Sequence, residues 1–316
     1  MPEIRKASTI NGATMRRFYA AAFPDRADFL SEHWRWLYRV GRFPGIEPLV
    51  LVENEHVIGH AGVIPLTISR LGRAATATWF VDFSILPEFQ GQGHGMALTE
   101  AWMALCPDRI TFCNDRSIRV FRKFGWRERY DASVRTLPIL GGPVRLALGV
   151  LFSGAPKLRT GPLPRDPAEL SHMLGDSSAA PVRVLRDEDW TRWRLYEHPR
   201  ATEHILAEHD GVQAVIRLFN SLGRRRAHLL HIGPGPAARR TRLVAAFARW
   251  AVEQGARSAW MATNDPGLLA ASSLRLPRSF TLRFAWHSDD ASVGQALFAG
   301  LPTQGLDSDH DLMFPC

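Results

Sequence analysis

The chain has 316 residues, of which 46% are hydrophobic, and it carries a formal net charge of +8. This length and composition are typical of a soluble globular protein with roughly two domains. No apolar run approaches the roughly 18 residues of a membrane span, and the N-terminus lacks the apolar core of a signal peptide, so we expect no membrane span and a cytoplasmic location.

The basic residues and the cysteines argue against two further classes of protein. Only Lys6, Lys123 and Lys157 are lysines among 39 basic residues, and the arginines are spread through both halves of the chain, so nucleic-acid binding is not expected. Three irregularly spaced cysteines do not make a disulfide framework or a zinc site, and no metal is indicated. We interpret Cys113, at the end of a strand-like run, as a small buried hydrophobe, with a reactive thiol as the alternative.

The first 140 residues are predicted to form one domain of helices and mostly antiparallel strands. Helix-period apolar residues predict helices over about 14–22 and 29–40. Strand-like runs follow at 49–52, 57–68 and 77–86. A helix over 96–105, a strand over 110–113 and a short helix ending at Phe124 complete the predicted order.

A glycine-rich turn, Gln90 to Gly95, joins the third strand-like run to the helix over 96–105. Such a turn directs backbone N–H groups and the positive end of a helix dipole at one point, which suits a diphosphate. No Gly-Lys-Ser/Thr follows, and the glycine spacing is not Gly-x-Gly-x-x-Gly, which excludes two familiar phosphate loops. One glycine turn is also ordinary punctuation between a strand and a helix, so a second motif has to support it.

That second motif runs from Asn114 to Trp126, as Asn-x-x-Ser-x-x-Val-Phe-x-Lys-x-Gly-Trp. Asn114 is a residue that caps helices, and Gly125 suits the end of a short helix. Together with Gln-x-x-Gly-x-Gly after Ile85-x-Pro87, this motif resembles the two motifs of the GNAT superfamily of acyl-CoA N-acyltransferases. The resemblance implies an α/β (α+β) fold, a mixed and mostly antiparallel sheet flanked by helices, with splayed central strands.

The resemblance also implies where acyl-CoA would bind, with acetyl-CoA as the expected co-substrate. The pantetheine arm would lie between the strands over 77–86 and 110–113 like an added strand. Amides of the glycine turn would hold the diphosphate, and the side chain of Gln90 would brace the turn. The implied cofactor-binding residues are Phe83, Ser84, Ile85, Leu86, Gln90, Gly91, Gln92, Gly93, His94, Gly95, Asn114 and Phe121.

The implied reaction is direct transfer of an acetyl group to an amine, driven mainly by positioning. A backbone N–H on the strand ending at Leu86 would stabilise the thioester oxygen. Asp82 is the best-placed general base, and a structural aspartate bonded to a neighbouring loop is the alternative. Phe121 stands where the family often has a tyrosine acid, so water or a group such as Tyr130 would protonate the thiolate.

The second half, 167–316, is predicted to be a degenerate copy of the first domain, after a Gly- and Pro-rich linker over 141–166 with one short helix at 144–152. The repeat is inferred from Trp190 to Tyr196, from strand-like runs over 205–208, 212–219, 227–232 and 258–262, and from helices over 237–254 and after Pro266. At the place of the glycine turn stands Gly233-Pro234-Gly235-Pro236, whose prolines lack backbone donors.

Three functions remain open at this point. They are an acetyl-CoA-dependent N-acetyltransferase with an active first domain, a non-catalytic acyl-CoA sensor, and a transferase with a longer acyl donor. The acceptor amine and the oligomeric state are not indicated by any motif.

Overall fold

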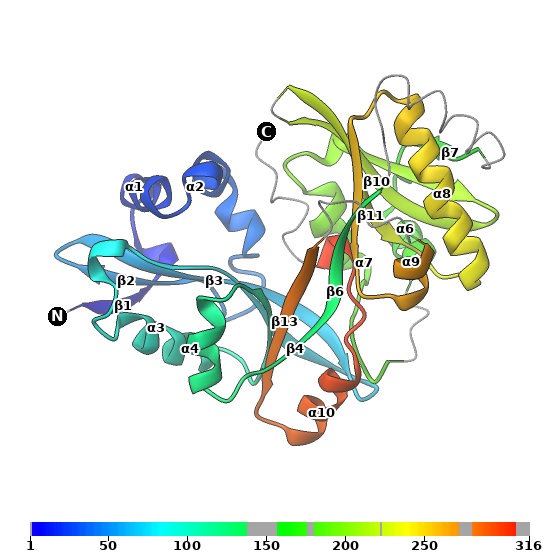
Figure 1. Ribbon diagram of the computed structural model, residues 1–316. Helices are drawn as coiled ribbons and strands as arrows, with labels where there is room; N and C mark the ends of the chain where they lie inside the picture. Colours follow the sequence, from blue (N-terminus) through cyan, green and yellow to red (C-terminus); the bar gives the residue numbers. More distant parts are fainter. Residues whose placement is uncertain (1, 138–156, 176–179, 222, 272–279, 308–316) are drawn as a thin grey trace. The chain divides into compact units, whose positions relative to one another are not determined.

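The computed structural model describes residues 2–137, 157–175, 180–221, 223–271 and 280–307 (Figure 1). These residues fall into two compact units, and the predicted architecture of mixed sheets flanked by helices is confirmed. Unit 1 takes the described residues of Met1–Arg129, Pro181–Val184 and Arg283–Leu301. Unit 2 takes those of Tyr130–Ala180, Leu185–Leu282 and Pro302–Cys316.

Unit 1 is built on the strand order β1-β2-β3-β4-β5-β13, with β8 paired to β3. Its strands are β1 (Glu3–Lys6), β2 (Leu49–Glu53), β3 (His56–Arg70), β4 (Arg73–Ile85), β5 (Asp108–Cys113), β8 (Val182–Val184) and part of β13 (Phe280–Ser288). Its helices are α1 (Gly12–Ala22), α2 (Ala27–Leu37), α3 (His94–Met103), α4 (Ser117–Lys123) and α10 (Ala291–Ala299). The β4–β5 pair is parallel and its neighbours are antiparallel, as predicted.

The helices of unit 1 cover both faces of its sheet. The α1 and α2 helices lie on one face of β3 and β4, and α3 and α4 lie on the other (Figure 1). The side chain of Asn11 caps α1 by accepting from the Thr14 N–H at 2.9 Å. On the opposite face, Trp102 of α3 stacks on Phe80 of β4 with ring centroids 3.5 Å apart. The sheet is therefore buried on both sides where the glycine turn leaves it.

Unit 2 is built on a second run of strands, most of them from the second half of the chain. Its strand order is β6-β12-β11-β10-β9-β7. The strands are β6 (Arg127–Leu137), β7 (Arg159–Gly161), β9 (His204–His209), β10 (Val212–Ser221), β11 (Arg224–Ile232) and β12 (Ser258–Thr263). The helices are α6 (Pro167–Leu174), α7 (Glu188–Thr191), α8 (Ala237–Glu253) and α9 (Pro266–Ala271). Leu243 and Phe247 of α8 are buried against the sheet.

The compact units differ from the predicted ranges 1–140 and 167–316, because each half of the chain gives a strand to the other unit. From the first half, β6 pairs with β12 in unit 2 along Ser133–Leu137. From the second half, β13 pairs with β5 in unit 1 along Arg283–Ser288. The domain ranges 1–140 and 167–316 stay a prediction about the sequence. The two compact units are made by packing in which β6 and β13 are exchanged.

The structure describes residues 157–166 of the predicted linker over 141–166. Arg159–Gly161 pair with β9 as the edge strand β7, so these residues belong to the sheet of unit 2. The short helix predicted at 144–152 lies outside the described residues.

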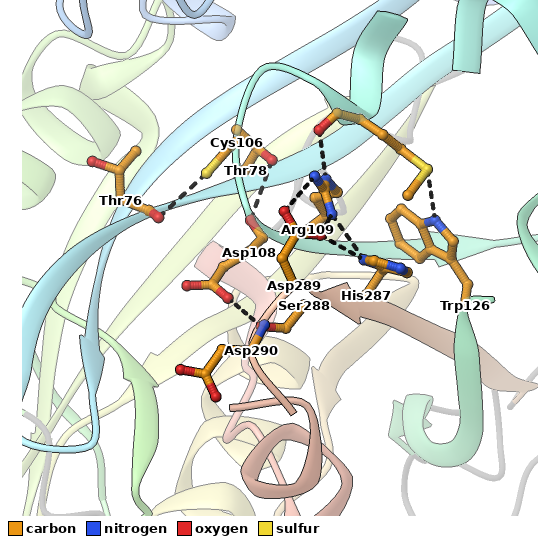
Figure 2. A network of polar contacts seen from close by, with 11 residues as sticks. Thr76, Thr78, Cys106, Asp108, Arg109, Trp126, His287, Ser288, Asp289 and Asp290 are labelled. Carbon is orange, nitrogen blue, oxygen red and sulfur yellow. Dashed lines mark hydrogen bonds and ion pairs between the residues drawn. The ribbon is translucent and has the colours of Figure 1, made fainter. Parts of the chain in front are cut away.

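A polar network fastens β13 to β5 (Figure 2). The guanidinium of Arg109, on β5, donates to both carboxylate oxygens of Asp289 at 2.7 and 3.1 Å, and through Nε to the Met103 carbonyl at 2.7 Å. Ser288 Oγ donates to Asp108 at 2.6 Å. The Arg109 hydrogen bonds hold the pKa of Asp289 below its ordinary value. Two-point contact with a buried arginine fixes this end of β13 in place.

Candidate active site

The gap between β4 and β5 begins where their pairing ends. The parallel register runs from Thr78↔Arg109 to Phe80↔Thr111, although β4 continues to Ile85 and β5 to Cys113. At the last pair, Thr111 Oγ1 donates to the Phe80 carbonyl at 2.7 Å. Beyond this point β4 stays paired with β3, and β5 stays paired with β13. The two central strands are therefore splayed, as predicted.

The glycine turn opens onto α3 beside this gap. Gly91 and Gly93 have φ of +79° and +84°, a left-handed conformation that favours glycine, and Gly93 is the N-cap of α3. The Gln90 side chain donates to the Ile85 carbonyl at 2.8 Å. The turn is thus tied to the end of β4 by Gln90, as the resemblance implies.

The glycine turn is open to solvent. Gly91, Gln92 and Gly93 are exposed, and a Cβ atom added at either glycine would meet nothing within 4 Å. Among the described residues, no hydrogen bond to another part of the chain is found for the N–H groups of Gly91 to Gly95. The first N–H groups of a helix have no partners within the helix and attract anions. The turn can therefore cradle a diphosphate.

The backbone of β4 next to the gap has a defined orientation. Leu86 donates its N–H to the Ile58 carbonyl on β3 at 2.9 Å and accepts from Phe89 N–H at 3.0 Å, so both of its backbone groups are used. Ser84 lies two residues before Leu86, so its backbone groups face β3 as the Leu86 N–H does. Because backbone groups alternate along a strand, Phe83 and Ile85 direct theirs away from β3 and toward the gap. These two residues, and not Leu86 or Ser84, are the donors that β4 offers there.

The Asp82 side chain lies on the side of β4 from which Arg26 and Tyr38 approach, and both of them bind its carboxylate. Its carboxylate accepts from Arg26 Nη1 at 2.7 Å and from the Tyr38 hydroxyl at 2.8 Å, and its side chain is only 3% exposed. Burial and the Asp82 charge raise the pKa of Tyr38, which keeps that hydroxyl a donor. A buried carboxylate held by two donors fits the structural alternative better than a free base.

The remaining predicted groups are placed as follows. Asn114 Oδ1 accepts from the N–H groups of Arg116 and Ser117 at 2.9 and 3.0 Å and so caps α4. Phe121 is 2% exposed and stacks on Trp126 at 4.7 Å, so contact with a ligand would require it to leave the core. Tyr130 is exposed and belongs to unit 2. Burial raises the pKa of Cys113 to about 12, which favours a neutral thiol.

The corresponding turn of unit 2 is closed by its own packing. The Gly233 N–H donates to the Gln213 carbonyl at 2.8 Å, and Pro234 and Pro236 have no N–H. A Cβ atom at Gly235 would come within 2.7 Å of the Val212 side chain. This turn offers no row of free donors comparable to Gly91–Gly95.

A segment of the chain also fills the space where β11 and β12 diverge. The Gln304 side chain accepts from the Ile232 N–H at 2.8 Å and donates to the Ile232 carbonyl at 3.0 Å. The Gln304 backbone bridges to Thr263 of β12, and Thr303 exchanges two hydrogen bonds with Asn264. The Pro302–Asp307 segment therefore contacts both strands beyond their parallel register, which runs from Arg226↔Ser258 to Leu229↔Met261.

Two kinds of feature are absent from the part of the chain that the structure describes. No group of three or more His, Cys, Asp or Glu side chains there is arranged to hold a metal ion. No helix within it is long and apolar enough to cross a membrane.

Comparison with known proteins agrees with this geometry. Residues 13–126, which carry both motifs, match the acetyltransferase (GNAT) family. No curated protein was found to match the sequence. A GCN5-related N-acetyltransferase from Kribbella flavida superposes with a TM-score of 0.61 at 16% identity, covering 93% of this chain and 73% of that one. The corresponding protein from Anabaena variabilis gives 0.60 at 12% identity, covering 93% and 74%.

A third similar structure is Saccharomyces cerevisiae N-myristoyltransferase with bound myristoylCoA, with a TM-score of 0.59, 8% identity and coverage of 90% of this chain and 82% of that one. At such low identities these likenesses establish the fold alone. Residues 13–126 thus resemble the GNAT acetyltransferase family in sequence, and the fold is similar to that of solved GNAT acetyltransferases.

Proposed function

We propose that this protein is an N-acetyltransferase that moves an acetyl group from acetyl-CoA directly to an amine, and that unit 1 holds its single donor site. The observation that carries the proposal is the open turn Gly91–Gly95 beside the gap between β4 and β5. Backbone donors at the turn suit a diphosphate, and a gap with unpaired strand edges suits the amide-bearing pantetheine arm. The two features are adjacent because Gln90 ties the turn to Ile85.

In the proposed reaction the amine gives up a proton to water and attacks the thioester carbonyl. The C–S bond breaks as the amide forms and the nitrogen loses its extra proton to water, and CoA leaves as a thiolate that takes up a proton from water. The backbone N–H groups of Phe83 or Ile85 would stabilise the carbonyl oxygen as it gains negative charge. Alignment of the two substrates supplies most of the rate increase. Phe121 has no hydroxyl, and the Asp82 carboxylate is held by Arg26 and Tyr38. Water is therefore the proposed carrier of protons.

We further propose that the second half is a degenerate copy without a donor site of its own. Its turn has prolines and a packed glycine in place of free donors, and Pro302–Asp307 fills the space between its diverging strands. One bound acyl-CoA for each chain is the expected stoichiometry.

Two alternatives have an observation in their favour. The engagement of Asp82 and the buried Phe121 leave no free acid or base at these positions, which favours a non-catalytic acyl-CoA sensor. The likeness to a myristoyltransferase fold makes a longer acyl donor the other alternative. Both use the same site, so one set of measurements separates them.

The test combines turnover with donor binding. The purified protein is mixed with acetyl-CoA or myristoyl-CoA and a panel of amino sugars, amino acids, polyamines and peptides, and released thiol is measured. We expect thiol release with acetyl-CoA and at least one amine class. Binding of both donors without any turnover would favour the sensor, and turnover with myristoyl-CoA alone would favour the longer donor.

A matched pair of variants tests the location of the site. Gly93→Asp places a carboxylate where the diphosphate is proposed, and we expect acetyl-CoA binding to be lost. Gly72→Asp is the control, because Gly72 has φ of +85° and equally open surroundings in the β3–β4 turn. Both changes cost about 1–2 kcal/mol of backbone strain. Equal acetyl-CoA affinity in the two variants would rule out this turn.

A further inference from the structure

The β4 strand contains an extra residue directly after its last pair with β5. Gly62 pairs with Val81 and His60 pairs with Ser84, so Ala61 alone faces two residues, Asp82 and Phe83. Asp82 has φ of +50°, an uncommon conformation for a residue other than glycine. Such a bulge bends a strand and increases its twist. It lies two residues beyond Phe80, where the gap begins.

The bulge determines which backbone groups face the gap. The Phe80 carbonyl accepts from Thr111 and therefore faces β5. Unbroken alternation from Phe80 would direct the backbone groups of Ser84 and Leu86 to the same side, yet the Leu86 N–H donates to Ile58 on β3. One extra residue shifts the alternation by one position, so Phe83 and Ile85 face the gap instead.

Three side chains on other elements hold this bulge. Arg26, in the turn Pro24–Arg26 before α2, and Tyr38, at the end of α2, bind the two carboxylate oxygens of Asp82. His60 on β3 donates its Nδ1–H to the Asp82 backbone carbonyl at 2.8 Å. Arg26 precedes α2, Tyr38 ends it, and His60 packs against Phe18 and Tyr19 of α1, so these contacts come from the side of the sheet where α1 and α2 lie.

The surroundings show that the cluster is built closely. A Cβ atom at Gly62 would lie 2.9 Å from the Tyr38 ring and 2.8 Å from the Val81 carbonyl, so only glycine lets Tyr38 reach Asp82. His60 is wholly buried among the rings of Phe18, Tyr19 and Tyr38. A left-handed residue other than glycine is strained and persists only where its surroundings hold it.

We propose that Arg26, Tyr38 and His60 are positioning residues, which hold the Asp82 bulge and thereby select the β4 backbone donors that meet the acyl group. The inference rests on the proposed function. It assigns Asp82 a role in strand geometry, in place of the role of general base.

The test compares Asp82→Asn, Arg26→Gln and Tyr38→Phe with the wild type. Each variant removes or weakens one contact of the bulge, and misplacement of a reacting group by about 1 Å can cost about 100-fold. We expect kcat with acetyl-CoA to fall by about 10- to 100-fold in the first two variants and less in Tyr38→Phe. The affinity for free CoA should stay within about threefold, because the diphosphate turn is untouched.

The pH dependence of kcat separates positioning from base catalysis. The charged or titratable groups facing Asp82 are Tyr19 from α1, Arg26, Tyr38 and His60. For a positioning role, we expect kcat to fall equally at every pH, and Arg26→Lys to restore part of the loss. If Asp82 were the base, Arg26→Gln would retain activity and move the acidic limb to higher pH, because a carboxylate without its guanidinium partner protonates more easily.

A control and a binding measurement complete the design. Arg5→Gln makes the same chemical change in the exposed Arg5–Glu3 pair of unit 1 and should leave kcat unchanged. Wild-type kcat in all bulge variants, or a shifted acidic limb in Arg26→Gln, would overturn the inference. Absence of both CoA binding and turnover in the wild type would instead overturn the proposed function, and with it this role. Tyr38→Phe removes a single hydroxyl, which keeps the test valid if Asp82→Asn does not fold.

Discussion

His60 links acid stability to the residues around the bulge. His60 is fully buried, and burial lowers its pKa to about 4. The hydrogen bond to the Asp82 carbonyl acts to raise this pKa, and the nearby Arg26 charge acts to lower it. An exposed histidine in the unfolded chain titrates near 6.5. Between these values the unfolded state binds more protons, so the free energy of unfolding increases with pH through this window. The imidazole is neutral at pH 7, which leaves Nδ1–H to donate and Nε2 as the basic nitrogen.

The first prediction concerns this window. We expect the wild type to lose stability as pH falls from about 6.5 to 4, by up to about 3 kcal/mol from His60 alone. His60→Gln should be less stable at pH 7, but the difference from wild type should shrink toward pH 4. Urea unfolding followed by circular dichroism at half-unit pH steps measures both curves. Parallel curves would contradict the assignment of a depressed pKa to His60.

A second buried histidine provides the comparison for this measurement. Burial, together with the Arg186 charge, lowers the pKa of His231 in unit 2 to about 3. His231→Gln should remove a separate share of the acid sensitivity, so the pH dependence of the double variant should be flatter than that of either single variant. Because the two histidines lie in different units, their effects should add.

At the scale of elements, Gln304 occupies the space between the diverging strands β11 and β12 of unit 2. Gln304 bonds both backbone groups of Ile232, and its backbone N–H donates to Asp307 Oδ2 at 2.7 Å. Asp307 is in turn bound at two points by the buried Arg186, at 2.9 and 2.7 Å. The Pro302–Asp307 segment is thus anchored by Arg186 and Asp307 and does not depend on the Gln304 side chain.

The second prediction follows from that anchoring. Gln304→Ala leaves the Ile232 N–H and carbonyl without their partner, and we expect a loss of about 2 kcal/mol of unfolding free energy. The exposed Gln295 on α10 provides the control Gln295→Ala, which should cost little. Calorimetric titration with acetyl-CoA should still give one site for each chain, since Pro234 and Pro236 have no N–H and the Gly233 N–H is bonded to Gln213. Two sites in wild type or variant would contradict the degenerate copy.

The elements that follow local rules were the predictable ones. The capping Asn114 and the left-handed Gly125 at the end of α4 are read from neighbouring residues. The bulge at Asp82 was not predicted, because it depends on Arg26 and Tyr38 from distant parts of the chain. The same holds for Gln304, whose partner Ile232 lies 72 residues away.

At the scale of the whole molecule, the exchange of strands makes the two halves depend on each other. The sequence motifs of the donor site end at Trp126, yet β5 receives its second neighbour, β13, from residues 283–288. The sequence does not predict this exchange, because nothing in the residues of β6 or β13 indicates which unit the strand will join. The GNAT family match therefore covers the motifs but not every strand that supports them.

The third prediction is that a chain ending at residue 140 will not bind acetyl-CoA. Without β13, β5 would expose an unpaired edge, and the buried Arg109 would lose the two-point contact with Asp289. In the full chain, Asp289→Asn should lower the unfolding free energy by about 1–3 kcal/mol, because it weakens the pairing of a buried guanidinium. Asp115→Asn is the matched control, since Asp115 is 86% exposed in its ion pair with Arg283, and such pairs contribute about 0–1 kcal/mol. Acetyl-CoA binding by the truncated chain at full-length affinity would show that unit 1 does not need the exchanged strand.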